Sequence, residues 1–385
     1  MAWWVLVAGF ALLASHPFVT YPLTLAVARL IAGGRSTHPA ADPGRLRVAV
    51  LCCAYNEETV IRDKLANALR LKAQDPSTEI LFYTDGCSDR TAAIIAEHDE
   101  VRLIASDRRF GKSHGMNLLA AAAADADLLL FTDANVRIDE HAIAAARRAF
   151  ADPSVGCVCS HLVYVNPGES ATASVGARYW SFDEWLKRLE SDTGSCIGAD
   201  GSLFVIRRAL FTPVPDDIID DFFTSLSIWC AGWRVVMCPD LIAYERSAIY
   251  SREEFRRKVR IACRAFNCHR LLWPRIARLP AWDIYKYLSH KLLRWLSGGS
   301  LALAGLSLAL GTLAGAVAPP IALGVALAAG IALVGGTYRR LVPLAILREA
   351  VFAMTATAVG VVCSLRGQRF QTWAQPETTR QVRAG

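Results

Sequence analysis

The chain has 385 residues, of which 53% are hydrophobic, and a formal net charge of +7 at pH 7. Its hydrophobic residues are concentrated near the two ends, in runs too long for the buried helices of a soluble protein, which excludes a purely soluble protein. The positive charge suits an anionic membrane surface or phosphate-bearing ligands and does not distinguish between them.

The first hydrophobic run covers residues 3–33 and carries no charge before Arg29. It is long enough to cross a bilayer once, with Ser15-His16-Pro17 as a candidate break. A cleaved signal peptide is the alternative, but the basic n-region is missing and the apolar run is too long. We therefore expect residues 1–34 to be a retained membrane anchor.

Between residues 35 and 250, strand-length hydrophobic runs alternate with helical patterns. Such alternating units predict an α/β domain with a mostly parallel sheet and helices on both faces. The expected strands are 47–55, 79–85, 101–106 and 127–134, and the expected helices are 57–72, a helix capped by Ser88 or Asp89, and 113–124.

Polar residues stand at the carboxyl ends of these strands, where ligands bind in parallel sheets. Asn56-Glu57 follows the first strand, Asp85 ends the second, and Asp133 and Asn135 end the fourth. In an extended segment, residues i and i+2 point the same way, so Asp133 and Asn135 can share one ligand. Two oxygen ligands suit Mg²⁺ or Mn²⁺. A plain turn after the strand is the alternative for this pair.

Two other patterns have simpler interpretations. Gly111-Lys112-Ser113 resembles part of a P-loop, but that motif needs a glycine where Ser106 stands. Lys112 is a candidate phosphate contact, with a solvated surface lysine as the alternative. The 11 cysteines, such as the pair Cys52-Cys53, show no repeated C-x-x-C spacing. We interpret most of them as reduced packing residues, with no zinc site.

The C-terminal third repeats the hydrophobic character of the N-terminus. Residues 295–336 are uncharged, and Pro319-Pro320 near their middle predicts two membrane helices joined by a tight turn. A third candidate, 341–364, contains Arg348 and Glu349 and could either span the membrane or lie in its interface.

The positive-inside tendency places the middle domain in the cytoplasm. Basic residues follow the first hydrophobic segment and precede the second: Arg35, Arg45, Arg47, Lys286, Lys291 and Arg294. The expected organisation is an anchor (1–34), a cytoplasmic domain (35–250), basic interfacial helices (251–294), transmembrane helices (295–365) and a polar tail (366–385).

Five segments in order resemble a membrane-bound family 2 glycosyltransferase: "VLCCAYNEE", "FYTDGCSDRT", "FTDAN", "GADGSLFVIRR" and "IIDDFFTSLSIWCAGWRVV". The resemblance covers roughly residues 45–270, and the hydrophobic spans that flank this segment fit it too. It implies the Rossmann-like glycosyltransferase A-type fold, which is a nucleotide-binding sheet continued by an acceptor-binding half.

The resemblance also implies roles for individual residues. Tyr55, Glu57 and Asp85 would lie around the nucleotide base and ribose. Asp133 and Asn135 would stand in the Asp-x-Asp metal motif, with Asn in place of the second acid.

The second half of the resemblance concerns the reacting sugar. Asp200 would face the donor sugar or the acceptor. Asp221 would be the catalytic base, with Asp220 in the place of the preceding Glu. A helix N-terminal acid favoured by the macrodipole is the alternative for Asp221.

One departure from the family concerns the Gln-x-x-Arg-Trp motif of its polysaccharide synthases. Arg257 stands for Gln, and Arg260-Ile261 stands for Arg-Trp. The loss of the aromatic residue favours transfer of one sugar over processive synthesis. Arg260 could bind the diphosphate, and the segment also suits a basic amphipathic helix on the membrane surface.

The sequence therefore predicts an inverting glycosyltransferase of the plasma membrane, dependent on Mg²⁺ or Mn²⁺. Its expected partners are a nucleotide-sugar donor, most simply UDP-linked, a lipid or glycan acceptor, and membrane lipids, but no nucleic acid. A processive polysaccharide synthase is one alternative. A non-catalytic membrane scaffold or nucleotide-sugar sensor is the other, because Asn135 weakens the metal motif.

Overall fold

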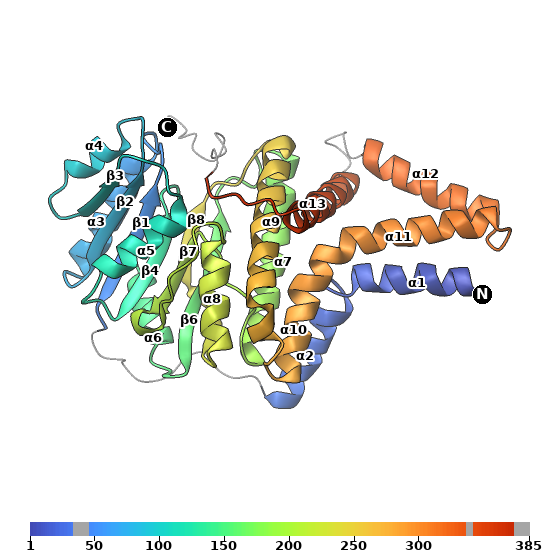
Figure 1. Ribbon diagram of the computed structural model, residues 1–385, viewed down its shortest axis with the longest axis horizontal. Helices are drawn as coiled ribbons and strands as arrows, with labels where there is room; N and C mark the ends of the chain where they lie inside the picture. Colours follow the sequence, from blue (N-terminus) through green and yellow to red (C-terminus); the bar gives the residue numbers. More distant parts are fainter. Residues whose placement is uncertain (34–45, 336–341, 373–385) are drawn as a thin grey trace.

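The computed structural model describes residues 1–33, 46–335 and 342–372, and Figure 1 shows them in three parts. An α/β half contains the sheet, a layer of long helices lies beside it, and a group of apolar helices projects from that layer. A cluster of acids around Lys112 lies between the first two parts.

One eight-stranded sheet forms the core of the α/β half, in the order β3-β2-β1-β4-β7-β6-β8-β5. Strands β3, β2, β1 and β4 are parallel, and β6 pairs in parallel with β8, whereas β7 is antiparallel to both of its neighbours and β5 is antiparallel to β8. The strands are β1 Val48–Ala54, β2 Glu79–Asp85, β3 Arg102–Ser106, β4 Leu128–Asp133, β5 Arg137–Ile138, β6 Val155–Tyr164, β7 Leu203–Arg207 and β8 Arg234–Glu245.

Alternating side chains of the central strands enter two different cores. In β1, Ala49 and Leu51 pack on the face covered by α5 and α8, while Val48 and Val50 pack on the face covered by α6. This explains why these strands are hydrophobic throughout. The helices on the two faces are α3 Ile61–Gln74, α4 Thr91–Ala96, α5 Lys112–Ala122, α6 Ala142–Ala149 and α8 Asp220–Cys230.

The four expected strands are confirmed to within one residue at each end. Helix α3 begins four residues later than predicted, because the backbone at Asn56 is left-handed (φ 51°) and a turn follows it. The Asn56 side chain holds this turn by bonding to Ser88, at 3.0 Å from its Nδ2 to the Ser88 hydroxyl.

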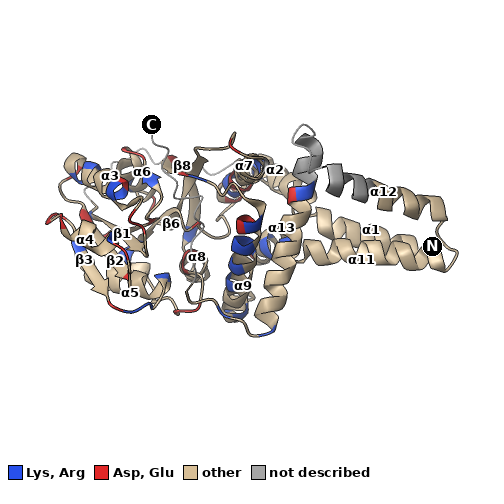
Figure 2. Ribbon diagram, turned by 90° about the horizontal axis from the view of Figure 1, so that it is seen from above, with Lys and Arg blue, Asp and Glu red and all other residues tan. Residues whose placement is uncertain are grey.

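The layer of long helices contains α7 Ala171–Asp192, α9 Ser251–Ile276 and α13 Val342–Leu365. Helices α9 and α13 touch at their backbones, because a Cβ at Gly360 would lie 2.6 Å from the carbonyl oxygen of Val259. Figure 2 shows Lys and Arg gathered along α9, whereas α1 and α11 carry almost no charge along their length.

The projecting part contains α1 Ala2–Ser15, α11 Leu293–Leu313 and α12 Pro319–Gly335. Residues 314–318 join α11 to α12, so the predicted helix pair with a tight turn before Pro319 is present. Helix α11 continues α10, Ala281–Tyr287, through a π-helical turn, Leu288–Leu292. Residues 281–313 therefore form one helix of 33 residues, long and apolar enough to cross a membrane.

The N-terminal run is not one straight helix. The candidate break at Ser15-His16-Pro17 is present, and α1 is bent by 58° from α2, Thr20–Ala32. Helix α1 projects beside α11, whereas α2 packs against α7 through Tyr21 and Leu25. Counted as one bent span, this pair would be the third candidate crossing in the described part of the chain.

The last hydrophobic segment has the length and composition of a span over Arg348–Leu365. Helix α13 runs crosswise to α1 and α11, as Figures 1 and 2 show together. The two alternatives for this segment, a span and an interfacial helix, both stay predictions. Within the expected polar tail, residues 366–372 are described, and 373–385 lie outside the described residues.

Candidate active site

Lys112 lies at the centre of a cluster of acids. Its Nζ is 2.7 Å from Oδ1 of Asp133 and 3.0 Å from Oδ2 of Asp220. The ends of β4 and the starts of α5 and α8 meet here. Burial alone would lower the pKa of Lys112, but the charges of Asp133 and Asp220 outweigh it and hold the pKa well above its usual range. Lys112 is thus an ion-paired lysine whose side chain is only 19% exposed, and its interpretation as a solvated surface lysine is wrong.

The two acids that begin α8 have opposite shifts in pKa. Burial and then the charge of Asp220 raise the pKa of Asp221 from 3.8 to about 7. Burial also acts to raise the pKa of Asp220, but Lys112 and Arg264 overcome it and lower that pKa. Near neutral pH the pair therefore combines an ionised acid with one poised to exchange a proton, which is an arrangement that acid–base catalysis uses.

The loop before β7 passes directly beside Asp221. A Cβ at Gly201 would lie 3.1 Å from Oδ2 of Asp221 and 3.4 Å from Nζ of Lys112. The absence of a side chain at position 201 leaves room for another group to approach the Asp221 carboxylate. The preceding residue, Asp200, is held by Lys187 of α7, at 2.5 Å between Oδ2 and Nζ.

Helix α9 faces the acids with a row of arginines. Arg264 donates to the carbonyl oxygen of Ile218, just before α8, at 2.6 Å. Burial, with the charges of Arg257 and Arg264, lowers the pKa of Arg260 to about 9, while Asp133 and Asp220 act in the opposite direction. Arg257 lies 3.0 Å from Glu254. The structure thus places both predicted arginines of the altered motif on the helix that lines the site.

The predicted nucleotide-binding residues lie at the ends of β1 and β2. The guanidinium of Arg109 stacks 3.5 Å from the centroid of the Tyr55 ring. Asp85 is buried and accepts hydrogen bonds from the backbone N–H groups of Phe110 and Gly111, at 2.7 and 3.0 Å. Glu57 is also buried, at 3% exposure. Asp85 therefore fixes the loop that leads into Lys112.

Asn135 lies in a turn and not in the extended segment that we expected. The backbone N–H of Val136 bonds to the carbonyl oxygen of Asp133, which closes that turn. The Asn135 Nδ2 donates to Oε1 of Glu245, 3.2 Å away, which leaves its Oδ1 available to a cation. The turn after the strand is confirmed, and shared binding of one ligand by Asp133 and Asn135 stays a prediction.

These residues fit a divalent cation only with help from substrate. No group of three or more His, Cys, Asp or Glu side chains with metal-binding geometry occurs in the described part of the chain. One carboxylate at Asp133 and one amide oxygen at Asn135 are oxygen donors, and Mg²⁺ is commonly held by one or two carboxylates together with substrate phosphates. The donor set is therefore compatible with the predicted Mg²⁺ or Mn²⁺.

The sequence profile of the glycosyltransferase-like family 2 matches residues 43–264, more than half of the chain. The chain belongs to this family. Curated relatives include the poly-beta-1,6-N-acetyl-D-glucosamine synthase of Staphylococcus epidermidis, 24% identical over 210 residues, which are 52% of this chain and 48% of the relative. The chain thus spans about half the length of the curated relatives it matches.

The fold comparison covers almost the whole chain. The mannosyltransferase PcManGT from Pyrobaculum calidifontis, in complex with GDP-Man and Mn²⁺, superposes with a TM-score of 0.73 and 23% identity, over 94% of this chain and 99% of that one. This likeness confirms the predicted glycosyltransferase A-type fold.

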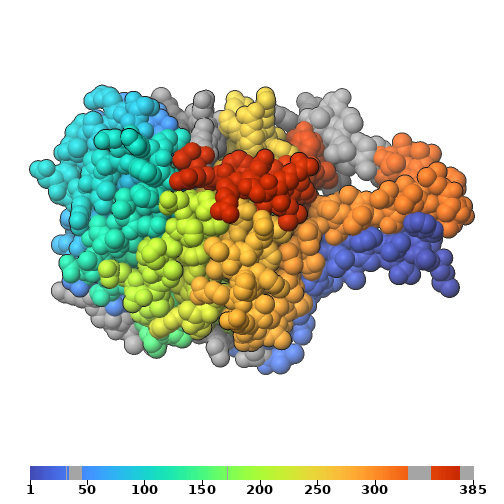
Figure 3. All heavy atoms as spheres, in the orientation of Figure 1, coloured from blue at the N-terminus to red at the C-terminus, as the bar shows by residue number. Residues whose placement is uncertain are grey.

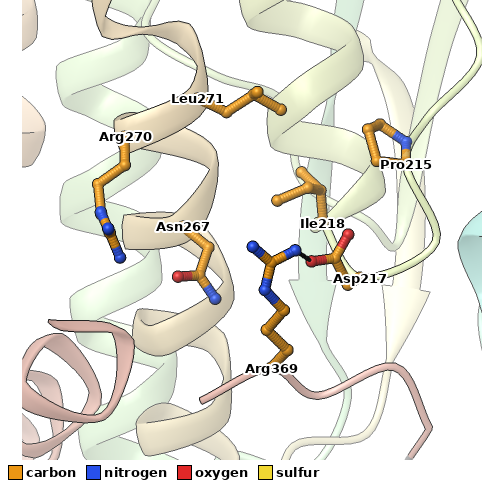
Figure 4. Close-up of a pocket in the computed structure, with 7 residues that line it drawn as sticks. All are labelled: Pro215, Asp217, Ile218, Asn267, Arg270, Leu271 and Arg369. Atoms are coloured by element: carbon orange, nitrogen blue, oxygen red, sulfur yellow. Dashed lines mark hydrogen bonds and ion pairs between the residues drawn. The ribbon is translucent and has the colours of Figure 1, made fainter. Parts of the chain in front are cut away.

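A surface cavity of about 360 Å³ lies beside the acid cluster and outside it. Figure 4 shows its lining: Pro215, Asp217, Ile218, Asn267, Arg270, Leu271 and Arg369. Arg369, which lies in the segment that follows α13, forms an ion pair with Asp217. Figure 3 shows this C-terminal segment lying on the surface between α9 and the α/β half.

Our sequence analysis missed several residues of the site. Arg264 follows Arg260 by one helical turn, so the spacing of the basic helix could have revealed it. Arg109, Lys187 and Glu245 could not be found in this way, because each comes from an element whose position only the fold determines.

Proposed function

We propose that the protein transfers a sugar from a nucleotide-sugar donor to a membrane-associated lipid or glycan acceptor, with inversion at the anomeric carbon. The observation that carries the proposal is Asp221, a carboxyl group with a pKa of about 7 beside the Lys112 cluster and an open loop backbone. A base works best when its pKa lies near the operating pH.

In this mechanism Asp221 removes the proton from the acceptor hydroxyl as its oxygen attacks the anomeric carbon. The bond from that carbon to the phosphate oxygen breaks, and the nucleoside diphosphate leaves. Lys112 and Arg260 stabilise the negative charge that develops on the diphosphate. Asp220 stays ionised, and burial together with the charge of Asp220 keeps the pKa of Asp221 high.

A divalent cation would be held by Asp133 and Asn135. When bound, it supplies further neutralisation of the leaving diphosphate. We assign the nucleotide to the edge formed by Tyr55, Glu57 and Asp85, with UDP as the expected nucleotide. Asp200 and Arg257 would contact the sugar or the acceptor.

We place the site on the cytoplasmic side of the plasma membrane, in cell-envelope or exopolysaccharide synthesis. Helices α1, α11 and α12 project from the side of the molecule away from the sheet, as Figure 1 shows. The acid cluster lies between the sheet and α9, so a soluble donor and a membrane-held acceptor can reach it from opposite sides.

Donor binding can be tested by thermal stability of the purified protein with UDP, GDP or CMP, each with and without Mn²⁺. A ligand at about a hundred times its dissociation constant should stabilise the fold by roughly 2.7 kcal/mol. The expected shift requires one nucleotide and the metal, and it disappears in Asp133→Ala. If no nucleotide raises the thermal midpoint of the folded protein, the assignment of the donor site is wrong, and the result supports the non-catalytic scaffold.

A processive polysaccharide synthase is the second candidate, because the matched curated relatives are synthases of a polymer. The length of the product on a gel separates the two. A ladder or smear of long products would support the synthase, whereas a single added sugar would support one transfer.

A further inference from the structure

Lys291 lies against the loop 198–201, at the end opposite Lys112. A Cβ at Gly198 would lie 3.7 Å from Cε of Lys291, whereas Gly201 faces Asp221 and Lys112. Lys291 lies in the π-helical turn before α11, and its Nζ is 5.6 Å from the centroid of the Phe222 ring. One short loop thus connects Lys291 to the proposed base.

Lys291 is an ammonium group without an acidic partner. Its hydrogen-bond partner within the described ranges is Nε2 of His290, at 3.3 Å. Asp183 and Glu190 act on its charge from beyond ion-pair distance, and no described carboxylate lies within that distance. Buried or half-buried ammonium groups usually have a counter-ion. This side chain is therefore suited to meet an anion that arrives with a ligand.

Arg294 lies one turn further along the same helix. Its Nη1 donates to the hydroxyl of Tyr179, at 2.9 Å, and to Asp183. Its Nε and Nη2 are buried and have no hydrogen-bond partner among the described residues. Two buried donors without acceptors cost free energy, so a ligand that accepts from them would be stabilised.

The position of these cations indicates what carries the anion. They lie immediately before residues 295–313, the uncharged part of the 33-residue helix that is long enough to cross a membrane. Tyr179 and Trp185 are exposed on the adjacent α7, at 39% and 45%, as aromatic side chains are at the level of lipid head groups. A phosphate presented at this depth would belong to a lipid.

We propose that Lys291 and Arg294 bind the phosphate of a lipid-linked acceptor whose sugar extends along the loop 198–201 to place its hydroxyl at Asp221. The inference rests on the proposed function and specifies its acceptor as a phosphate-bearing glycolipid. Because both cations come from the helix at the membrane side, the lipid chain can remain in the bilayer while the sugar reacts.

The test measures binding by the full chain in nanodiscs of zwitterionic phosphatidylcholine. Dodecyl phosphate, dodecanol and inorganic phosphate are titrated separately, and the thermal midpoint is followed. We expect stabilisation by dodecyl phosphate alone. Lys291→Met should weaken that binding about tenfold or more, because a charged hydrogen bond is lost. Lys72→Met, which removes a partly exposed lysine of the α/β half, should bind as the wild type does.

Three results would overturn the proposal. The first is that Lys291→Met binds dodecyl phosphate as tightly as the wild type does. The second is that dodecanol stabilises the wild type as much as dodecyl phosphate does. The third is that inorganic phosphate does so, which would make this a site for free phosphate. Nucleotide binding is measured in parallel with Asp133→Ala. That variant should lose the nucleotide and keep dodecyl phosphate, so failure of the donor site and failure of the lipid site are read independently.

Discussion

Replacing Asp221 by Asn should stabilise the folded protein at neutral and alkaline pH. The wild-type protein must keep a carboxyl group with a pKa of about 7 in a place where burial and Asp220 oppose its ionisation. The amide has nearly the same shape and carries no charge. An enzyme that has placed an acid there for chemistry gives up stability, and the substitution recovers it.

The size and sign of the effect follow from the two pKa values. A shift from 3.8 to about 7 corresponds to about 4 kcal/mol at 1.36 kcal/mol per unit. Asp221 is partly exposed, so screening by solvent reduces this, and we expect about 1–3 kcal/mol. Because the folded pKa is raised, the stability that this group contributes is fully present below pH 4 and is lost as the pH rises through 7.

The assay is thermal unfolding of wild type and Asp221→Asn between pH 4 and 9. The stability of the variant relative to wild type should increase between pH 4 and 7 and then become constant. Asp216→Asn, an exposed acid shortly before α8, is the control and should change the thermal midpoint little at any pH. A difference for Asp221→Asn that is independent of pH, or a variant that is less stable at pH 8, would refute the reasoning.

The same group predicts the dependence of catalysis on pH. With Asp221 as the base, kcat/KM should fall about tenfold for each pH unit below 7. Asp220→Asn removes the second largest cause of the raised pKa and should therefore move this limb to lower pH. A wild-type profile that stays flat from pH 5 to 8 would exclude Asp221 as the group that takes the proton.

Three further changes test the packing around the site. Lys112→Met leaves a group of acids without their shared cation, so Mn²⁺ should raise the thermal midpoint more in this variant than in wild type. Lys187→Met removes the cation of a buried ion pair and leaves the Asp200 carboxylate without it. The variant should lose about 3–5 kcal/mol in the free energy of unfolding, measured by denaturant titration. Gly360→Ala forces α13 away from α9 and should cost about 1–3 kcal/mol, whereas Gly299→Ala, with open space around it, should cost nothing measurable.

The first half of the sheet was predictable because its signals are local. Strands buried on both faces are hydrophobic throughout, and their polar ends mark the edge where ligands bind. Asp85 and Asp133 were found in this way. The strands β5–β8 were not assigned. Helices alternate with these strands too, but parallel and antiparallel pairs are mixed among them, and long-range packing sets that order.

The partners of each site residue were not predictable from local pattern. Lys112 had two equal interpretations until α8 brought Asp220 to within 3.0 Å of it. The altered Gln-x-x-Arg-Trp segment indicated an arginine near the diphosphate, but only the packing of α9 shows that Arg264 holds the chain at Ile218 just before the acid pair. Pairings over a hundred residues apart depend on the whole topology.

The chemistry of this site depends on the helical layer as much as on the sheet. The sheet half supplies Asp133 and Lys112, and α8 supplies the acid pair, whereas α9 supplies the arginines that would face an anionic donor. Side chains of α9, among them Phe266, belong to the same core as the central strands. A fragment ending before α9 would therefore expose that core and keep acids without arginines beside them. With Lys112 as the cation left in the cluster, such a site would hold a diphosphate less tightly, so we expect the catalytic unit to include the helices that join the sheet to the apolar segments.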